Sequence, residues 1–274
     1  MVTCARGRTA TTARATSKPD PLRPDEEQEP TLTAPVVLPV DEAIALLERG
    51  ELSVEGRVMD ASNATLYCGI TADGVSAACV YKPIAGERPL WDFPDCTLAE
   101  REVAAYEVSA ATGWNVVPPT VYRLGPAGPG MVQLWIDTDD DADLVSLIRK
   151  RGNEAIRRMA VYDAVINNGD RKGGHLIPVP DGHVYGVDHG VTFNVDDKLR
   201  TVLWQWAGRP LSDEATDVLK RVRRDLDGAL GERLYGLLTT AEVRRTKARV
   251  DRLLAARRHP EPSDEWPSVP WPPM

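Results

Sequence analysis

Several features that would assign the chain to a particular class are absent or scarce. No stretch approaches the roughly 18 consecutive apolar residues that cross a bilayer, and residues 1–17 lack the apolar centre of a secretory signal. The four cysteines show no CxxC spacing and the four histidines form no HExxH motif, so neither a disulfide framework nor a zinc enzyme is indicated. We therefore expect a cytoplasmic protein with free thiols and no integral membrane segment.

The charge balance excludes a further class of partner. Acidic side chains number 41 against 33 basic ones, which gives a net charge of -8, whereas nucleic-acid binders usually present a basic face. Hydrophobic residues make up 42% of the 274 residues, which is enough for a sizeable core. We expect a globular protein that does not bind nucleic acid.

Hydrophobic periodicity divides the chain into a strand-rich half and a helix-rich half. The first half is predicted to contain helices at 43–49 and 98–112 and strands at 52–60, 64–70, 75–81, 116–122 and 131–136. The second half is predicted to contain helices at 144–151, 154–167, 198–207, 213–227 and 240–257 and short strands at 175–179 and 183–187.

These elements predict an α+β fold with two lobes between two irregular ends. The strand-rich N-lobe covers residues 36–136 and the helix-rich C-lobe covers 137–258. Residues 1–35 lack an apolar period and are expected to be a disordered arm. The tail at 259–274 is rich in proline and tryptophan, and we expect it either to pack along the surface or to extend from it.

A lysine and a glutamate in the N-lobe have the spacing of an ion pair. Lys82 ends an apolar strand, from which its cation can reach the α- and β-phosphates of a nucleotide. Glu102 lies on the next helix, one turn before Tyr106, where it can pair with Lys82 and fix its conformation. There are two alternative interpretations. In these, Lys82 is an ordinary lysine at the end of a strand, with its ammonium in solvent, and Glu102 is a solvated carboxylate on a helix.

Two aspartates in the C-lobe flank the predicted strands at 175–179 and 183–187. Asp170 can accept the proton of an attacking hydroxyl, and Asp188 can bind the metal ion that bridges the phosphates. Lys172 can neutralise charge on the transferred phosphoryl group. Simple turns around Asp170 and Asp188 are the alternative, but the order of parts is that of a two-lobed protein-kinase-like fold.

These residues also carry a family resemblance. The segments 102–106, 117–120, 163–177 and 187–190 resemble the phosphatidylinositol 3- and 4-kinase-like superfamily, with the type II phosphatidylinositol 4-kinases and their bacterial relatives as the nearest branch. The chain is similar also to an actinobacterial family described as kinase-like. The resemblance covers roughly residues 50–205 and is most specific at the loop around Asp170.

The resemblance implies a set of nucleotide contacts. It implies that Lys82 binds phosphate, that Asp170 is the catalytic aspartate and that Asp188 binds Mg²⁺. It also implies that the segment 133–136, with Gln133 and Trp135, is the hinge whose backbone meets adenine. The residues implied to contact the purine are Val80, Ile136 and Val187.

The sequence departs from the superfamily pattern at two places. The pattern has an asparagine as metal ligand where this chain has His175, and an imidazole suits Mn²⁺ or a water-mediated contact better than direct binding of Mg²⁺. The turn at 60–65 contains no glycine, although Ser62, Asn63 and Thr65 can offer hydrogen-bond donors to phosphate.

Three functional hypotheses follow from these residues. The first is an ATP-dependent kinase that phosphorylates a hydroxyl of a small molecule, a lipid head group or a protein. The second is a pseudokinase that binds nucleotide or acts as a scaffold, which His175 and the glycine-free turn would favour. The third is a phosphotransferase for a cationic molecule such as an aminoglycoside, with the acidic run 137–143 as the acceptor wall. That run is equally consistent with a solvated loop that caps the helix predicted near Leu144.

Overall fold

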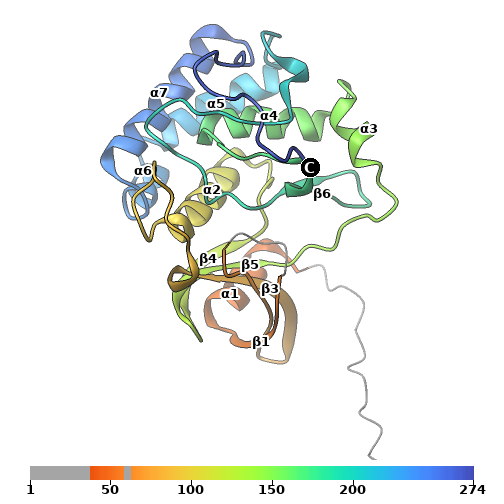
Figure 1. The fold of residues 1–274 in the computed structure, drawn as a ribbon, viewed down its shortest axis with the longest axis vertical. Coiled ribbons are helices and arrows are strands. Elements are labelled where there is room, and N and C mark those ends of the chain that lie inside the picture. The colour runs from red at the N-terminus through yellow and green to blue at the C-terminus, as the bar shows by residue number, and fades with distance from the viewer. Residues whose placement is uncertain (1–37, 59–62) are drawn as a thin grey trace, which may run out of the picture. The chain divides into compact units, whose positions relative to one another are not determined.

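The computed structural model of the chain describes residues 38–58 and 63–274, and the predicted arm at 1–35 lies outside them. An antiparallel sheet of five strands forms the first half of the described chain (Figure 1). In the order β1-β2-β3-β5-β4, its strands are Glu51–Arg57, Leu66–Ala72, Val75–Pro83, Gly128–Leu134 and Thr120–Gly125. Helix α1 (Val40–Arg49) packs on this sheet through Ala43, Leu46 and Leu47.

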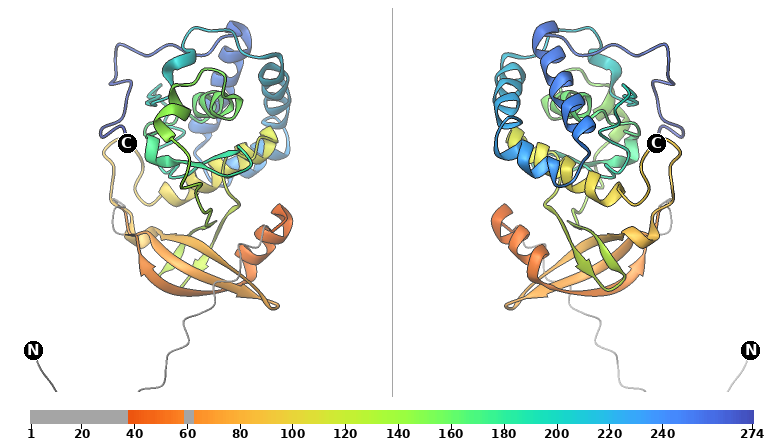
Figure 2. Two further views of the ribbon diagram at one scale, coloured as in Figure 1. Left: turned by 90° about the vertical axis from the view of Figure 1, so that its right-hand side faces the viewer. Right: turned by 90° about the vertical axis from the view of Figure 1, so that its left-hand side faces the viewer.

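Helices form most of the second half. They are α3 (Leu144–Arg149), α4 (Glu154–Ile166), α5 (Asp213–Asp225), α6 (Ala229–Tyr235) and α7 (Thr240–Ala256), whereas α2 (Leu98–Thr112) lies between β3 and β4 in the chain. Strands β6 (Leu176–Pro178) and β7 (Val184–Gly186) pair as a hairpin between α4 and α5. Helix α2 contacts β4 and β5 on one side and α5 and α6 on the other, so it links the sheet to the helices (Figure 2).

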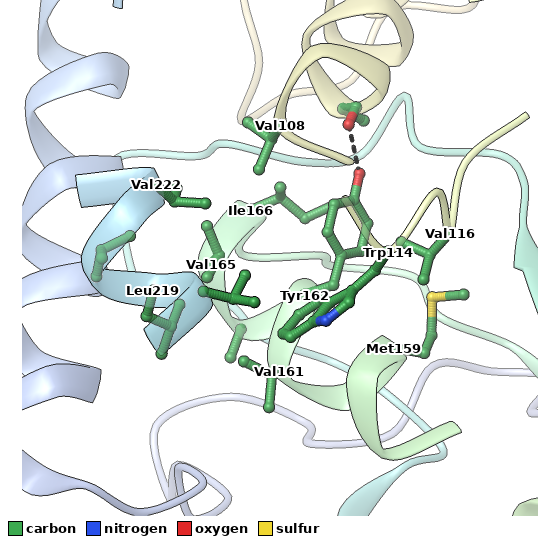
Figure 3. Packing of buried hydrophobic residues seen from close by; sticks show 14 of the residues in the cluster. Val108, Trp114, Val116, Met159, Val161, Tyr162, Val165, Ile166, Leu219 and Val222 are labelled. Carbon is green, nitrogen blue, oxygen red and sulfur yellow. Dashed lines mark hydrogen bonds between the residues drawn. The ribbon is translucent and has the colours of Figure 1, made fainter. Parts of the chain in front are cut away.

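The main hydrophobic core lies around α4, which buries residues on nearly every side. Its residue Tyr162 is fully buried, and the hydroxyl donates a 2.7 Å hydrogen bond to the backbone oxygen of Ala105 on α2 (Figure 3). Figure 3 shows Trp114 and Val222 of α5 among the core side chains that surround α4. Because α4 precedes residues 168–174, the core fixes the start of that loop.

The ends of several helices follow local sequence signals. The side chain of Asn153 accepts the backbone N–H of Ile156 at 3.1 Å, which caps α4. Thr239 and Glu242 form a reciprocal capping box at the start of α7. Gly113 ends α2 in the left-handed conformation, with φ of 68°, as glycine does readily at this position.

Two predicted elements differ from the structure. The prediction of a helix at 198–207 was wrong, because only the single turn Trp204–Trp206 is helical in this segment. The backbone of this segment instead bonds to the loop after α4, with the Arg200 N–H donating to Asn168 at 2.9 Å and the Val202 N–H donating to Arg171 at 3.1 Å. The strand expected from 116 begins only at Thr120, since Pro118 and Pro119 have no N–H to donate to a ladder.

No described helix is long and apolar enough to cross a membrane. The cysteines within the described residues, Cys68, Cys79 and Cys96, are free thiols.

Arg101 provides a test of how α2 is held against the C-lobe. Its guanidinium lies 2.5 Å from Glu242 of α7 and donates to the Thr192 carbonyl at 2.8 Å. The side chain of Arg101 is 1% exposed and that of Glu242 is 5% exposed. We expect Arg101→Met to lower the free energy of unfolding by about 3–5 kcal/mol, because it leaves a buried carboxylate without its cation. Urea unfolding measures the change.

The matched control is Lys220→Met, which removes an ion pair with Asp217 on the exposed face of α5. Exposed pairs contribute about 0–1 kcal/mol, so this variant should differ little from the parent. Equal losses in the two variants would show that burial does not decide the contribution of Arg101.

Candidate active site

Lys82 lies between two carboxylates that come from different parts of the chain. Its ammonium is 2.6 Å from Oε1 of Glu102 and 2.8 Å from Oδ1 of Asp188. Strand β3 supplies the lysine, α2 supplies the glutamate, and the segment after β7 supplies the aspartate. The predicted ion pair of Lys82 and Glu102 is therefore present, and Asp188 joins it.

Glu102 joins the lysine to the backbone of the segment around Asp188. The carboxylate is 2% exposed, and its second oxygen accepts the backbone N–H of His189 at 2.8 Å. Burial raises the pKa of Glu102, whereas Lys82 acts in the opposite direction. A carboxylate this buried has both oxygens bonded, one to a cation and one to an N–H, which fixes the lysine's position against the segment after β7.

Asp188 is the exposed member of the group. Its side chain is 47% exposed, and Lys82 holds the pKa of its carboxyl well below the ordinary value, against the opposite effect of burial. The backbone at Asp188 has φ of 60°, which is uncommon for a residue with a side chain. Burial alone would lower the pKa of Lys82. The nearby Asp188 and Glu102 carboxylates together have the larger, opposite effect, so the pKa is raised and the lysine stays charged.

His175 lies beside Asp188, with Nε2 3.5 Å from Oδ2 of the aspartate. Burial lowers the pKa of His175, and Asp188 opposes this effect, so the imidazole is neutral near pH 7. Its Nδ1 is buried and has no hydrogen-bond partner within 38–58 and 63–274.

These two side chains fit a divalent cation that takes its remaining ligands from phosphate and water. The half-exposed Asp188 carboxylate offers oxygen, and the neutral His175 ring offers nitrogen, a donor set that suits Mn²⁺ better than Mg²⁺. The described part of the chain has no group of three or more His, Cys, Asp or Glu side chains arranged for a metal.

Asp170 and Lys172 lie on the loop that joins α4 to β6. Their side chains form a 3.0 Å ion pair and are 26% and 23% exposed, so both have polar atoms open to a bound molecule. The turn itself is capped by Asn168, whose Oδ1 accepts the Asp170 N–H at 2.9 Å. Because Asn168 caps the turn, the Asp170 carboxylate is not needed for that purpose.

A buried network beneath this loop was not anticipated from the sequence. Arg171 and Asp163 of α4 are both fully buried and lie 2.9 Å apart. Arg171 also donates to the carbonyl oxygens of His175 and Val187 at 3.3 and 3.2 Å, and its Nη2 lies 2.6 Å from Nε2 of His189. The guanidinium thus joins α4, the Asp170 loop and the Asp188 segment. The one sequence signal for this network was Asp163, an aspartate among the apolar residues of α4.

The residues of the sheet that were predicted to contact nucleotide lie in different environments. Ser62 lies outside the described residues, and Asn63 Oδ1 accepts the backbone N–H of Arg88 at 2.9 Å. Gln133 is buried and donates to Thr120 at 2.9 Å, and its backbone lies in β5 between β3 and β4. Val80 is half-buried on β3.

The predicted hinge follows β5. Trp135 packs edge-on against Tyr67, with ring centroids 5.0 Å apart, and its indole donates to Asp137 at 3.0 Å. The backbone N–H of Leu134 donates to Pro119 and that of Trp135 donates to Ala78. Contact between this segment and adenine stays a prediction, as do the roles of the other site residues.

The acidic run 137–143 has the capping role that was one of its two interpretations. The carboxylate of Asp143 accepts the Ser146 N–H at 3.0 Å at the start of α3, and Asp139 bonds through its backbone to Pro178 of β6. A surface depression elsewhere on this lobe contains none of the predicted site residues, and it is lined by 150–155, Arg158 and 181–183.

Comparison with known proteins gives one close relative in sequence and a kinase likeness in structure. No protein-family model matches the chain. Protein Rv2133c of Mycobacterium tuberculosis is 46% identical over 266 residues, covering 85% of this chain and 95% of the relative. The golgi casein kinase structure is similar with a TM-score of 0.50 at 12% identity, over 79% of this chain and 75% of that one. The Helicobacter pylori proinflammatory kinase CtkA has a TM-score of 0.46 at 12% identity, over 77% of this chain and 94% of that one. The observed elements, together with the similarity to the golgi casein kinase structure, confirm the predicted two-lobed, kinase-like α+β fold.

The buried histidine of the network predicts how stability depends on pH. Burial, followed by the Arg171 guanidinium, holds the pKa of His189 well below 6.5, and Nε2 faces a group that can only donate. An unfolded chain therefore takes up a proton below about pH 6.5 that the folded chain does not accept. We expect the free energy of unfolding to fall as pH drops from 7.5 to 5.

His189→Gln removes this titration while keeping a polar side chain. The dependence on pH should then be shallower, by up to about 1.4 kcal/mol per pH unit, in urea unfolding at a series of pH values. The lowered pKa of Asp188 acts in a separate window, below about its ordinary value of 3.8. Identical slopes in parent and variant would contradict the role given to His189.

Proposed function

The chain belongs to the family of Protein Rv2133c of Mycobacterium tuberculosis and has a kinase-like fold, and on this basis we propose that it is an ATP-dependent phosphotransferase. It would move the γ-phosphoryl group of ATP to a hydroxyl acceptor. The observation that carries the proposal is Lys82 held between Glu102 and Asp188, because kinases use such a lysine for phosphates and such an aspartate for the metal ion.

In the proposed complex, different charged side chains bind the phosphates and the metal ion. Lys82 supplies a permanent cation for phosphate oxygens, and Glu102 holds that cation in place from the buried side. Asp188 and His175 would hold a divalent cation, which stabilises the phosphate charge when it is bound. In the proposed complex Lys82 exchanges its Asp188 partner for phosphate, since Asp188 then faces the cation.

Asp170 and Lys172 would act in the transfer step. As the acceptor oxygen bonds to the γ-phosphorus, the bond from phosphorus to the oxygen of the leaving ADP breaks, and the acceptor proton passes to the Asp170 carboxylate. Lys172, 3.0 Å from Asp170, can stabilise charge on the transferred group. Solvent then takes the proton from Asp170.

The proposal defines the acceptor by its reacting group. A small molecule, a lipid head group and a protein side chain all supply a hydroxyl. The resemblance to the phosphatidylinositol 3- and 4-kinase-like superfamily supports a head group, and the acidic run 137–143 beside β6 supports a cationic molecule. An acceptor screen with labelled ATP distinguishes these classes.

A pseudokinase is the second candidate, and two observations favour it. His175 occupies the position of a metal-binding asparagine, and Lys82 already neutralises Asp188. A pseudokinase would bind nucleotide without transferring phosphate, so turnover separates the two functions.

The test of the proposed function is Asp170→Asn. The amide keeps the shape of the side chain but cannot accept the proton, so turnover should fall by about 10² or more. Thermal stability and Mg-ATP affinity should stay close to those of the parent, because Asn168 caps this turn. The measurement pairs a thermal melt with a phosphotransfer or ATP hydrolysis assay.

Asp181→Asn is the matched control. Asp181 accepts the His183 N–H at 2.8 Å in the turn between β6 and β7, so it is a turn carboxylate outside the site. Its turnover should equal that of the parent. Equal turnover in the parent and in Asp170→Asn would contradict the catalytic role of Asp170 and would favour the pseudokinase.

A further inference from the structure

The end of the C-terminal tail lies against the loop that carries Asp170. Figure 1 shows the end of the chain beside β6. The carbonyl oxygen of Pro273 accepts the backbone N–H of Gly173 at 2.8 Å, directly after Lys172. Further back, the Ser268 carbonyl accepts the Thr201 N–H at 3.0 Å and the indole N–H of Trp204 at 2.8 Å. The tail segment 266–274 therefore bonds to the C-lobe at two places.

Both places lead to the same loop. Thr201 forms a parallel backbone bridge with Arg171, and the Arg171 N–H donates to Arg200 at 3.0 Å. The Ser268 anchor thus supports a segment that pairs with the residue between Asp170 and Lys172, while the Pro273 anchor holds the residue that follows. The tail segment 266–274 braces the backbone of the catalytic loop from its outer side.

Side-chain packing adds to the Pro273 anchor. Gly173 is buried, and a Cβ at this position would overlap the sulfur of Met274. The same Cβ would lie 3.4 Å from Ile148 of α3. Met274 therefore contacts Gly173, but the atoms concerned end the flexible side chain of a residue that is 54% exposed, so the Pro273 hydrogen bond carries the anchor.

The tail leaves the reacting groups open. With the tail in place, the side chains of Asp170 and Lys172 are 26% and 23% exposed, and that of Asp188 is 47% exposed. A segment that blocked the site would cover these atoms. Its contacts are instead with the backbone that carries them.

We propose that the tail segment 266–274 is a positioning element of the active site, which fixes the backbone that presents Asp170 and Lys172. This inference rests on the proposed phosphotransferase function. Lys82, Glu102 and Asp188 come from other segments, so nucleotide binding does not depend on the tail. Removing the tail lowers the rate of transfer and leaves ATP affinity in place, since a small displacement of a reacting group affects turnover most.

The experiment compares the parent with a chain that lacks residues 268–274 and with a chain that lacks only residues 273–274, which keeps the Ser268 anchor. Amide hydrogen exchange at Gly173 should become about tenfold faster or more in both, since the N–H loses Pro273. The kcat should fall by about tenfold or more, with the KM for ATP within about twofold of the parent. Thermal melts verify that each variant is folded.

A substitution elsewhere in the C-lobe separates the role of the tail segment 266–274 from a general loss of structure. Gly152→Ala is the matched control, because a Cβ at Gly152 meets no atom within 4 Å, and it should behave as the parent.

Unchanged exchange at Gly173 in the truncated chains would overturn the proposal, as would faster exchange with undiminished kcat. A KM for ATP that rises as much as kcat falls would also overturn it, since a merely structural role predicts that result. If the parent itself shows no turnover, the proposed function fails, and the exchange comparison alone decides whether the tail holds the loop.

Discussion

The candidate site depends on a lysine that is held between two carboxylates. Lys82 contacts Glu102 at 2.6 Å and Asp188 at 2.8 Å, so one cation joins β3, α2 and the segment after β7. Glu102 has a second bond to the backbone of His189, which means that α2 cannot shift without moving that segment. The buried carboxylate requires both partners, because a buried charge with either one missing is strongly destabilising. The position of α2 between sheet and helices is therefore tied to the geometry of the site.

A second buried cation continues this connection into the C-lobe. Arg171 bonds to Asp163 and to the backbone on both sides of the β6–β7 hairpin, and it lies beside the neutral ring of His189. His189 contacts both Glu102 and Arg171, one through its backbone and one through its ring, so the two cations share a residue. The tail reaches the same loop from outside through Gly173. Loop residues that are held from several sides keep their reacting groups in place without the reorganisation that a flexible loop would need.

Sequence reasoning was sufficient where the signal was local. The bounds of α2 follow from its apolar spacing and from Gly113, and Lys82 and Glu102 follow from the order of elements in a kinase. It failed where backbone pairing with a distant segment decided the conformation, as at 198–207, which bonds to the Asp170 loop. Helix α6 was missed because its seven residues lie between Gly228 and Gly236 and are too few to show a period. The burial of Arg171 and the approach of Met274 to Gly173 are tertiary facts that no local pattern carries.

Calorimetric titration of ATP, with Mg²⁺ or Mn²⁺ and with chelator, is the most direct test of whether the Lys82 group is a nucleotide site. The parent should bind ATP, and more tightly with the metal ion than without it, because Asp188 and His175 would hold the cation. Lys82→Met should weaken binding by about 1.5–3 kcal/mol, the size of a charged contact. Binding of ATP by the parent that is the same with chelator and unchanged in Lys82→Met would contradict the assignment of this group to phosphate and metal.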